Sequence, residues 1–212
     1  DRLTVILPNS SAWVEYFLAS MMGGWVFSPV PYFVNVQELK KILAYVNPKA
    51  IVTDREDINE NLGNKYNVLK VYEEQVSYKN YKRPQISENQ AAALYYSSGT
   101  TGNPKGVMYS HRNMTSLIAS IIRGYKFSSE DRQFAFLPFG HTASINYNIL
   151  PALMVGCDLI ISHGFEKLRQ NFFKVLAENR ITYTQIVPTV LLMLNKLDMN
   201  NKGIDLSSLK FI

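Results

Sequence analysis

Short apolar runs alternate with longer segments in which apolar residues recur at helical spacing. In the first quarter of the chain, runs at 3–7, 26–30 and 50–53 are separated by helical patterns at 10–22 and 35–46. Continuous apolar runs of this length are typical of buried parallel strands, and helices are their usual connections. The order strand, helix, strand, helix, strand predicts an α/β fold with a mostly parallel sheet flanked by helices.

End signals support both helices. Asn9 or Ser10 can cap the first helix, and Gly23 can close it. Asn35 and Glu38 have the spacing of a capping box at the start of the second. We therefore expect the apolar faces of these helices to form core rather than a binding surface.

Residues 54–90 are more polar, with one strand-like run at 68–72. We interpret them as an exposed connection and predict two α/β lobes of one domain, 1–85 and 86–212. After the connection the alternation resumes. Strands are predicted at 91–96, 107–109, 132–137, 157–162, 183–187 and 208–212, and helices at 110–123, 144–155, 166–178 and 189–197.

Targeting and membrane signals are weak. The uncharged segment 16–37 is long enough to span a bilayer, but a glycine pair and two prolines interrupt it, so a helix, turn and strand fit better. No signal peptide is visible. Because the chain lacks a starting Met and stops inside a strand-like run, we expect both ends to be boundaries of a fragment.

Composition is that of an ordinary globular protein, and it excludes some partners. The net charge is +5, but the basic residues are scattered, so we do not expect nucleic-acid binding. Cys157 is the only cysteine, which excludes an internal disulfide and suits a reducing compartment. We therefore predict a cytoplasmic location.

Hydroxyl side chains, glycines and a lysine are concentrated in residues 96–107, Tyr-Ser-Ser-Gly-Thr-Thr-Gly-Asn-Pro-Lys-Gly-Val. Glycines can turn backbone N–H groups inward, hydroxyls add neutral donors, and a lysine supplies positive charge for an oxyanion. A surface turn uses similar residues, but seldom so many between two apolar runs. We predict a phosphate-binding loop made of Ser97, Ser98, Gly99, Thr100, Thr101, Gly102, Lys105 and Gly106.

This loop does not match the common nucleotide-binding patterns. Gly106, rather than Ser or Thr, follows Lys105, so the motif of P-loop kinases and ATPases is broken. No Gly-x-Gly-x-x-Gly occurs either. A P-loop kinase or NTPase is therefore a disfavoured alternative.

Residues 96–107, with Ser110-His111-Arg112-Asn113 after them, closely resemble the signature loop of the adenylate-forming superfamily. Its members are acyl- and aryl-CoA synthetases, luciferases and the adenylation domains of peptide synthetases. The resemblance implies ATP-dependent activation of a carboxylic acid to an acyl adenylate and, in the intact protein, a CoA thioester. It also implies ATP, Mg²⁺ and CoA, with Thr100 as a metal ligand and Lys105, Thr100 and His141 as catalytic candidates.

A second segment, Phe139-Gly140-His141-Thr142, resembles the family's Pro-Leu-Phe-His stretch, which lines the carboxylate pocket. We predict that these residues, Phe139, Gly140, His141 and Thr142, bind the substrate. No acidic residue occurs in 138–156 to hold an amino group, which favours a fatty or aryl acid without an α-ammonium. Ile145, Tyr147, Ile149 and Leu150 suit either its tail or a helix core.

Other family elements are not found in these residues. They are the glycine-rich adenine-binding strand, the aromatic-Gly-x-Thr-Glu motif, the ribose-binding aspartate and the hinged small domain with its lysine. We therefore expect the chain to need a further C-terminal portion of the same enzyme and not to complete adenylation alone. The open alternatives are a ligase that loads a carrier protein and a nucleotide-binding module without catalysis.

Overall fold

The computed structural model describes residues 1–71, 82–97, 105–196 and 203–212. The chain divides into two compact units, Asp1–Thr115 and Ser116–Ile212. Both strands that flank the predicted loop lie in the first unit. This division differs from the lobes 1–85 and 86–212, which stay a prediction about the domain organisation of the whole protein.

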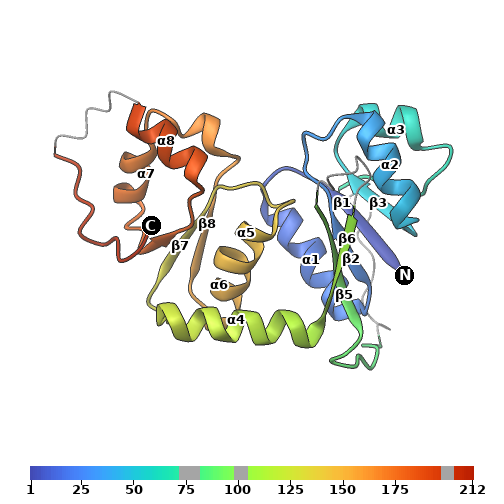
Figure 1. The fold of residues 1–212 in the computed structure, drawn as a ribbon, viewed down its shortest axis with the longest axis horizontal. Coiled ribbons are helices and arrows are strands. Elements are labelled where there is room, and N and C mark those ends of the chain that lie inside the picture. The colour runs from blue at the N-terminus through green and yellow to red at the C-terminus, as the bar shows by residue number, and fades with distance from the viewer. Residues whose placement is uncertain (72–81, 98–104, 197–202) are drawn as a thin grey trace. The chain divides into compact units, whose positions relative to one another are not determined.

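The first unit contains a six-stranded sheet in the order β4-β3-β1-β2-β5-β6 (Figure 1). Its first five strands pair in parallel, and β6 pairs antiparallel with β5. The strands are β1 (Arg2–Ile6), β2 (Val26–Pro29), β3 (Ala50–Thr53), β4 (Val68–Leu69), β5 (Ala91–Ser97) and β6 (Lys105–Ser110). The predicted mostly parallel α/β architecture is confirmed.

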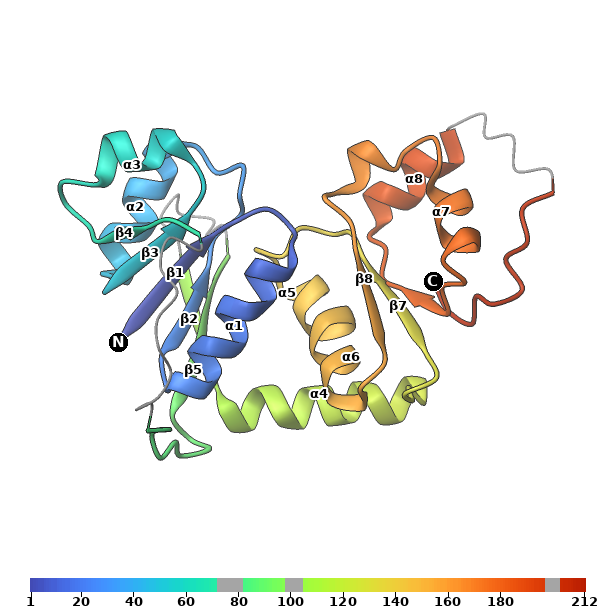
Figure 2. The same cartoon turned by 180° about the vertical axis from the view of Figure 1, so that it is seen from behind.

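Helices cover both faces of this sheet. α1 (Ser11–Gly23) lies on one face, and α2 (Val36–Val46) and α3 (Glu56–Leu62) lie on the other (Figures 1 and 2). The cap residues follow the sequence signals: Ser10 Oγ accepts from Trp13 N at 3.3 Å, and Asn35 Oδ1 accepts from Glu38 N at 2.8 Å. The apolar faces of both long helices are buried, as predicted.

The second unit contains a parallel sheet in the order β8-β7-β9. The strands are β7 (Arg132–Ala135), β8 (Asp158–Ile161) and β9 (Tyr183–Thr184). α4 (His111–Tyr125) enters this unit from the first. The other helical elements are α5 (Thr142–Ser144), η1 (Ile145–Ile149), α6 (Leu150–Val155), η2 (Phe165–Lys167), α7 (Phe172–Glu178) and α8 (Pro188–Lys196).

Two apolar clusters build this unit. Phe134 of β7 and Phe136 just after it pack against Phe172 of α7, and α8 adds Val190 and Leu194 to the same cluster. A second cluster joins residues of α4 to Phe127 and Tyr183, with residues of η1 and α6 packed against it. Phe134 of β7 and Tyr183 of β9, which lie on neighbouring strands of one sheet, thus belong to different clusters.

Several predicted elements differ from the structure. The polar connection 54–90 contains α3, which was not predicted because only Ile58 and Leu62 of its seven residues are buried. The helix predicted at 166–178 is divided into η2 and α7. The strand predicted at 208–212 contributes a single bridge, Phe211 to Tyr183.

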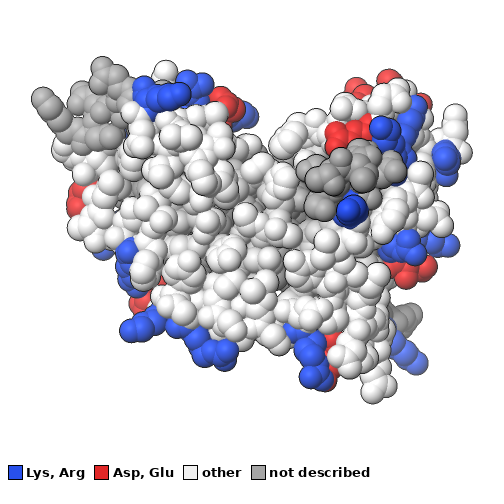
Figure 3. Space-filling model, in the orientation of Figure 1, with Lys and Arg blue, Asp and Glu red and all other residues white. Residues whose placement is uncertain are grey.

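The surface carries mixed charge. On the face drawn in Figure 3, basic and acidic side chains form separate small groups rather than one broad basic area. Among the described residues, no helix has the length and apolar character needed to cross a bilayer.

Candidate functional site

The hydroxyl- and glycine-rich loop connects the two strands of a hairpin. Ser97, the last residue of β5, pairs with Lys105, the first residue of β6. Since β5 is parallel to β2, both ends of the loop lie at the carboxyl edge of the sheet, where α/β folds bind ligands. The predicted phosphate-binding residues Ser98, Gly99, Thr100, Thr101 and Gly102 lie outside the described residues.

Lys105 is the basic residue of this hairpin. Its side chain is exposed, and its backbone is fixed in the ladder between β5 and β6. An ammonium on a flexible stem, attached to a fixed strand, suits the binding of a phosphate as a point charge.

Gly106 occupies a position with little space. A β-carbon there would lie 2.7 Å from Cε1 of Tyr45 and 2.9 Å from Cδ1 of Leu94. Real β-carbons do not approach other atoms this closely, so glycine lets β6 lie against α2. The structure thus gives Gly106 a packing role, and its predicted role in phosphate binding stays a prediction.

Tyr96 lies on β5, just before the loop, and its ring faces α2, the helix against which Gly106 packs. Its hydroxyl lies 2.8 Å from Oγ of Ser28, which is fully buried in β2. Burial raises the pKa of Tyr96 to about 12, and the hydrogen bond with Ser28 lowers it only partly. The phenol is therefore neutral at pH 7 and acts as a hydrogen-bonding group that joins β5 to β2.

The segment after β6 is held by a reciprocal cap. Asn113 N donates to Ser110 Oγ at 3.1 Å, and Ser110 N donates to Asn113 Oδ1 at 3.1 Å. The neighbouring His111 is partly buried; its Nε2 has no hydrogen-bond partner among the described residues, and desolvation lowers its pKa. His111 is therefore a partly buried side chain at the first position of α4, with a pKa below its usual value.

The second predicted segment follows β7 at the carboxyl edge of the second sheet. Phe139 is 1% exposed, whereas the side chain of His141 is exposed. The backbone N–H of His141 donates to the backbone carbonyl of Pro138 at 3.1 Å. Gly140 and Thr142 are half-buried. Of the four predicted substrate-binding residues, His141 is the one with an exposed side chain, while Phe139 packs inside its unit.

A short π-helix follows this segment, and the sequence did not reveal it. The N–H of Leu150 donates to the carbonyl of Ile145, one residue further back than in an α-helix. Pro151 has no N–H to continue the ordinary ladder, which accounts for the altered turn. Ile145 and Ile149 are fully buried, so they belong to the core rather than to an accessible acid pocket.

The π-helix also buries Asn148, which sequence reasoning missed. Asn148 is 1% exposed, and its Nδ2 has no hydrogen-bond partner among the described residues. π turns are frequent at functional sites. The proline within a predicted helix was the available signal for this turn.

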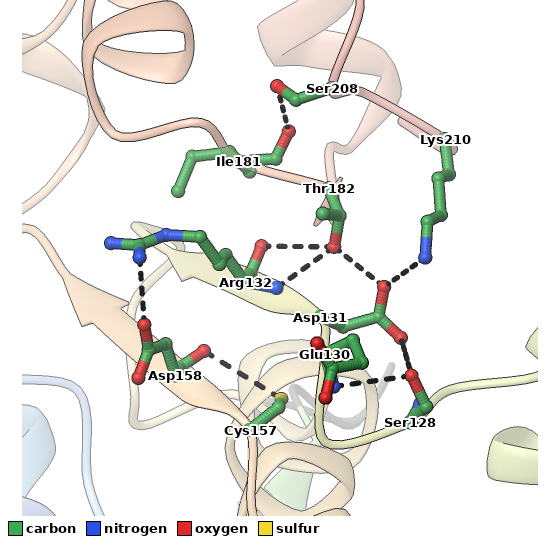
Figure 4. A network of polar contacts seen from close by, with 10 residues as sticks. All are labelled: Ser128, Glu130, Asp131, Arg132, Cys157, Asp158, Ile181, Thr182, Ser208 and Lys210. Carbon is green, nitrogen blue, oxygen red and sulfur yellow. Dashed lines mark hydrogen bonds and ion pairs between the residues drawn. The ribbon is translucent and has the colours of Figure 1, made fainter.

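A buried carboxylate organises the start of β7 (Figure 4). Asp131 accepts hydrogen bonds from Thr182 Oγ1 at 2.9 Å, Lys210 Nζ at 2.8 Å and Ser128 N at 2.8 Å. Burial alone would raise the pKa of Asp131, but these hydrogen bonds outweigh it and hold the pKa below its usual range. The network ties residues near 210 to β7 and β9.

Cys157 lies next to this network (Figure 4). Its Sγ donates weakly to Asp158 O at 3.7 Å, and burial raises the pKa of the thiol to about 11. Because the thiolate is the reactive form, Cys157 is not set up as a nucleophile.

The described residues contain no group of three or more His, Cys, Asp or Glu side chains that could hold a metal ion. The predicted magnesium ligand Thr100 lies outside the described residues. Magnesium binding therefore stays a prediction.

Comparison with protein families decides the class. A model of AMP-binding enzymes, described as "AMP-binding enzyme", matches residues 1–212. The chain belongs to the AMP-binding enzyme family.

Curated relatives of this AMP-binding chain include 4-coumarate–CoA ligases. It is 28% identical over 232 residues to 4-coumarate--CoA ligase 3 of Arabidopsis thaliana, a match that covers 100% of the chain and 41% of the relative. It is also 28% identical over 232 residues to 4-coumarate:CoA ligase 1 of Petunia hybrida, covering 100% of the chain and 42% of the relative. The chain thus spans about two fifths of the length of these relatives.

Solved structures share the fold. The structure of McyG A-PCP complexed with phenylalanyl-adenylate matches 99% of the chain and 36% of that protein, with a TM-score of 0.88 and 22% identity. A fatty acyl-adenylate ligase from L. pneumophila, in complex with acyl adenylate and pyrophosphate, matches 99% of the chain and 39% of that protein, with a TM-score of 0.87 and 21% identity. In this AMP-binding enzyme, the β5–β6 hairpin is therefore set in a fold shared with adenylate-forming proteins.

Proposed function

We propose that the intact protein activates a carboxylic acid with ATP and then transfers the acyl group to CoA. The carboxylate oxygen attacks the α-phosphorus, the bond to pyrophosphate breaks, and an acyl adenylate forms. The CoA thiol, losing its proton, then attacks the acyl carbonyl, and AMP leaves. The membership of the chain in the AMP-binding family supports the first step, and the CoA-ligase relatives support the second.

The observation that carries the proposal is the hairpin between β5 and β6. It brings Ser97 and Lys105 together at the carboxyl edge of the first sheet and leaves the Lys105 side chain exposed. The chemical difficulty in adenylation is the approach of a carboxylate to a phosphorus surrounded by negative oxygens. A cation attached to a fixed strand, together with backbone or hydroxyl donors, lowers that barrier by neutralising charge.

Residue roles follow from this chemistry. Lys105 offsets negative charge on the departing pyrophosphate, and the predicted donors of residues 97–102 orient the phosphates. Thr100 would contribute to holding Mg²⁺, which, when bound, would supply further charge neutralisation. The positive charge of Lys105 suits an anionic triphosphate. Because the predicted metal ligand Thr100 lies outside the described residues, we assign no step of the reaction to the metal.

The acid is proposed to be fatty or aryl and to lack an α-ammonium group. No acidic residue occurs in 138–156 to pair with an ammonium. The exposed His141, at the carboxyl edge of the second sheet, is the proposed contact with the carboxylate. Phe139, being buried, would shape this segment from inside rather than touch the acid directly.

The acceptor thiol is proposed to be that of CoA, because the curated relatives are named as CoA ligases. The phosphopantetheine thiol of a carrier protein is the second candidate. The structural match to McyG A-PCP at 22% identity shows a common fold and does not favour that acceptor by itself. A cytoplasmic location remains part of the proposal, since both thiols are available there.

The central test replaces Lys105 in the intact protein. We expect Lys105→Ala to lower the rate of ATP–pyrophosphate exchange by about 100- to 1,000-fold, the effect of losing one donor that stabilises transition-state charge. Lys40→Ala, which removes an exposed lysine from α2, is the matched control and should retain the wild-type rate.

The outcomes separate the proposed classes. Unchanged exchange in Lys105→Ala with every acid tested would remove Lys105 from the reaction. A wild-type protein that binds ATP without exchange would be a nucleotide-binding module. Transfer of the γ-phosphate, followed with labelled ATP, would favour the kinase alternative.

A further inference from the structure

One aromatic side chain on α2 contacts both strands of the loop-bearing hairpin. The ring of Tyr45 lies edge-on to the ring of Tyr96, with centroids 6.5 Å apart and an interplanar angle of 86°. The same ring lies close to Gly106: a β-carbon added there would be 2.7 Å from Cε1 of Tyr45 and 3.2 Å from its hydroxyl oxygen. Tyr96 and Gly106 are register partners, so Tyr45 packs against one rung of the hairpin.

This rung is next to the one that carries the proposed cation. Ser97 pairs with Lys105 directly after the Tyr96–Gly106 pair. The opposite strand is fixed at the same level, because the Tyr96 hydroxyl bonds to the buried Ser28. The ladder with β5 holds the β6 backbone at Lys105, and the close approach of Gly106 to Tyr45 limits how near this part of the hairpin lies to α2.

We propose that Tyr45 is a positioning residue for Lys105. Its ring stops β6 at a fixed distance from α2, and Gly106 provides the clearance that makes this distance short. The proposal rests on the proposed function, since it assigns Lys105 a charge to stabilise. It adds a residue that acts through its contact with the hairpin and that lies about 50 residues before the loop motif in the sequence.

The exposure of Tyr45 supports this assignment. Tyr45 is 54% exposed, so its removal leaves a surface position rather than an empty site in the core. The core beneath it is formed by fully buried residues of α2 and its neighbours, including Leu39, Leu43 and Val46. A Tyr45 variant should therefore keep the fold while it loosens the position of β6.

A double-mutant cycle tests the contact. In the intact protein, Gly106→Ala should lower kcat/KM for ATP in pyrophosphate exchange by about 100-fold, because displacements near 1 Å have effects of this size. Tyr45→Ala should lower it less. The double variant should recover part of the activity lost in Gly106→Ala, because removing the ring relieves the closest contact of the methyl group and leaves the one with Cδ1 of Leu94. Tyr45→Phe keeps the contacting ring edge and should retain wild-type kcat/KM.

Controls separate positioning from general damage. Gly124→Ala places a methyl group in open space on α4; it should leave exchange unchanged and keep or slightly raise thermal stability, since alanine favours helices. For the positioning role, exchange in Tyr45→Ala must fall while its melting temperature stays within the range of Tyr45→Phe. Independent, multiplicative effects of Tyr45→Ala and Gly106→Ala would overturn the proposal.

The failure of the proposed function is distinguished by the same assay. If the wild-type protein exchanges and Lys105→Ala does not, the proposed function stands, and the cycle alone decides the role of Tyr45. If the wild type shows no exchange with any acid, both the function and the positioning role are overturned.

Discussion

Single side chains connect parts of this chain that are distant in sequence. Asp131 joins the turn at Ser128, Thr182 just before β9, and Lys210, which lies 79 positions away. Asp131 is 3% exposed, so each of these donors satisfies a carboxylate that has little access to water. A buried charge is tolerated only when it is paired and hydrogen-bonded in this way.

Removing this carboxylate should destabilise the second unit. We expect Asp131→Ala to lower the free energy of unfolding by about 1–3 kcal/mol, because it leaves buried donors without an acceptor. The value stays below that for a fully buried pair because the Lys210 side chain is 54% exposed. Urea denaturation of the protein measures the change.

The matched control is Asp158→Ala. Asp158 pairs with Arg132 at 2.9 Å, but both side chains are largely exposed, at 63% and 41%. A surface pair of this kind contributes about 0–1 kcal/mol. Equal losses in the two variants would contradict the role given to burial at Asp131.

The same carboxylate predicts a pH dependence. The folded-state pKa of Asp131 is lowered, so its contribution to stability is present above the pKa of the unfolded chain and is lost as pH falls through the folded value. Wild-type stability should therefore fall on acidification below about pH 4 more steeply than that of Asp131→Asn. Parallel curves for the two proteins would show that other carboxylates dominate.

At the scale of elements, α4 starts directly after the hairpin and depends on a local cap. We expect Ser110→Ala to lower the free energy of unfolding by about 1 kcal/mol, because it removes the acceptor for the N–H of Asn113. The exposed Ser116→Ala, inside the same helix, should be neutral or slightly stabilising, since alanine favours helices. Amide hydrogen exchange at the first turn of α4 would show the cap's effect directly, and unchanged protection there would refute it.

Most elements could be predicted because their patterns were long and their caps clear. α1 and α2 follow this rule, and the Asn35 cap is observed as expected. α3 is short and largely polar, so it resembled a connection. The π turn depends on Pro151 and on backbone hydrogen bonds that residue periodicity does not reveal.

The antiparallel pairing of β5 and β6 could have been predicted from the sequence, but it was not. Parallel neighbours need a connection of about a dozen residues or more, and the loop between Ser97 and Lys105 is shorter than that. Its length therefore indicated an antiparallel hairpin. The contact of Tyr45 with Gly106 had no local signal, because it joins residues 61 positions apart (106 − 45) through the packing of a helix on a sheet.

At the scale of the whole molecule, the chain covers about two fifths of the length of the relatives compared. The family elements expected for adenine, ribose and the hinged lysine were not found in its sequence. We therefore predict that the 212-residue chain alone releases no pyrophosphate from ATP with a panel of carboxylic acids. Release above the level of a Lys105→Ala chain would show that these residues suffice.

The hairpin also bears on the thermodynamics of ligand binding. Bringing two ends of a flexible segment together costs conformational entropy, which grows slowly with segment length. Here the pairing of Ser97 with Lys105 meets that cost when the sheet folds, before any nucleotide arrives. A triphosphate bound as proposed then meets two strand ends whose separation is already fixed, so more of its intrinsic interaction energy remains as measurable affinity.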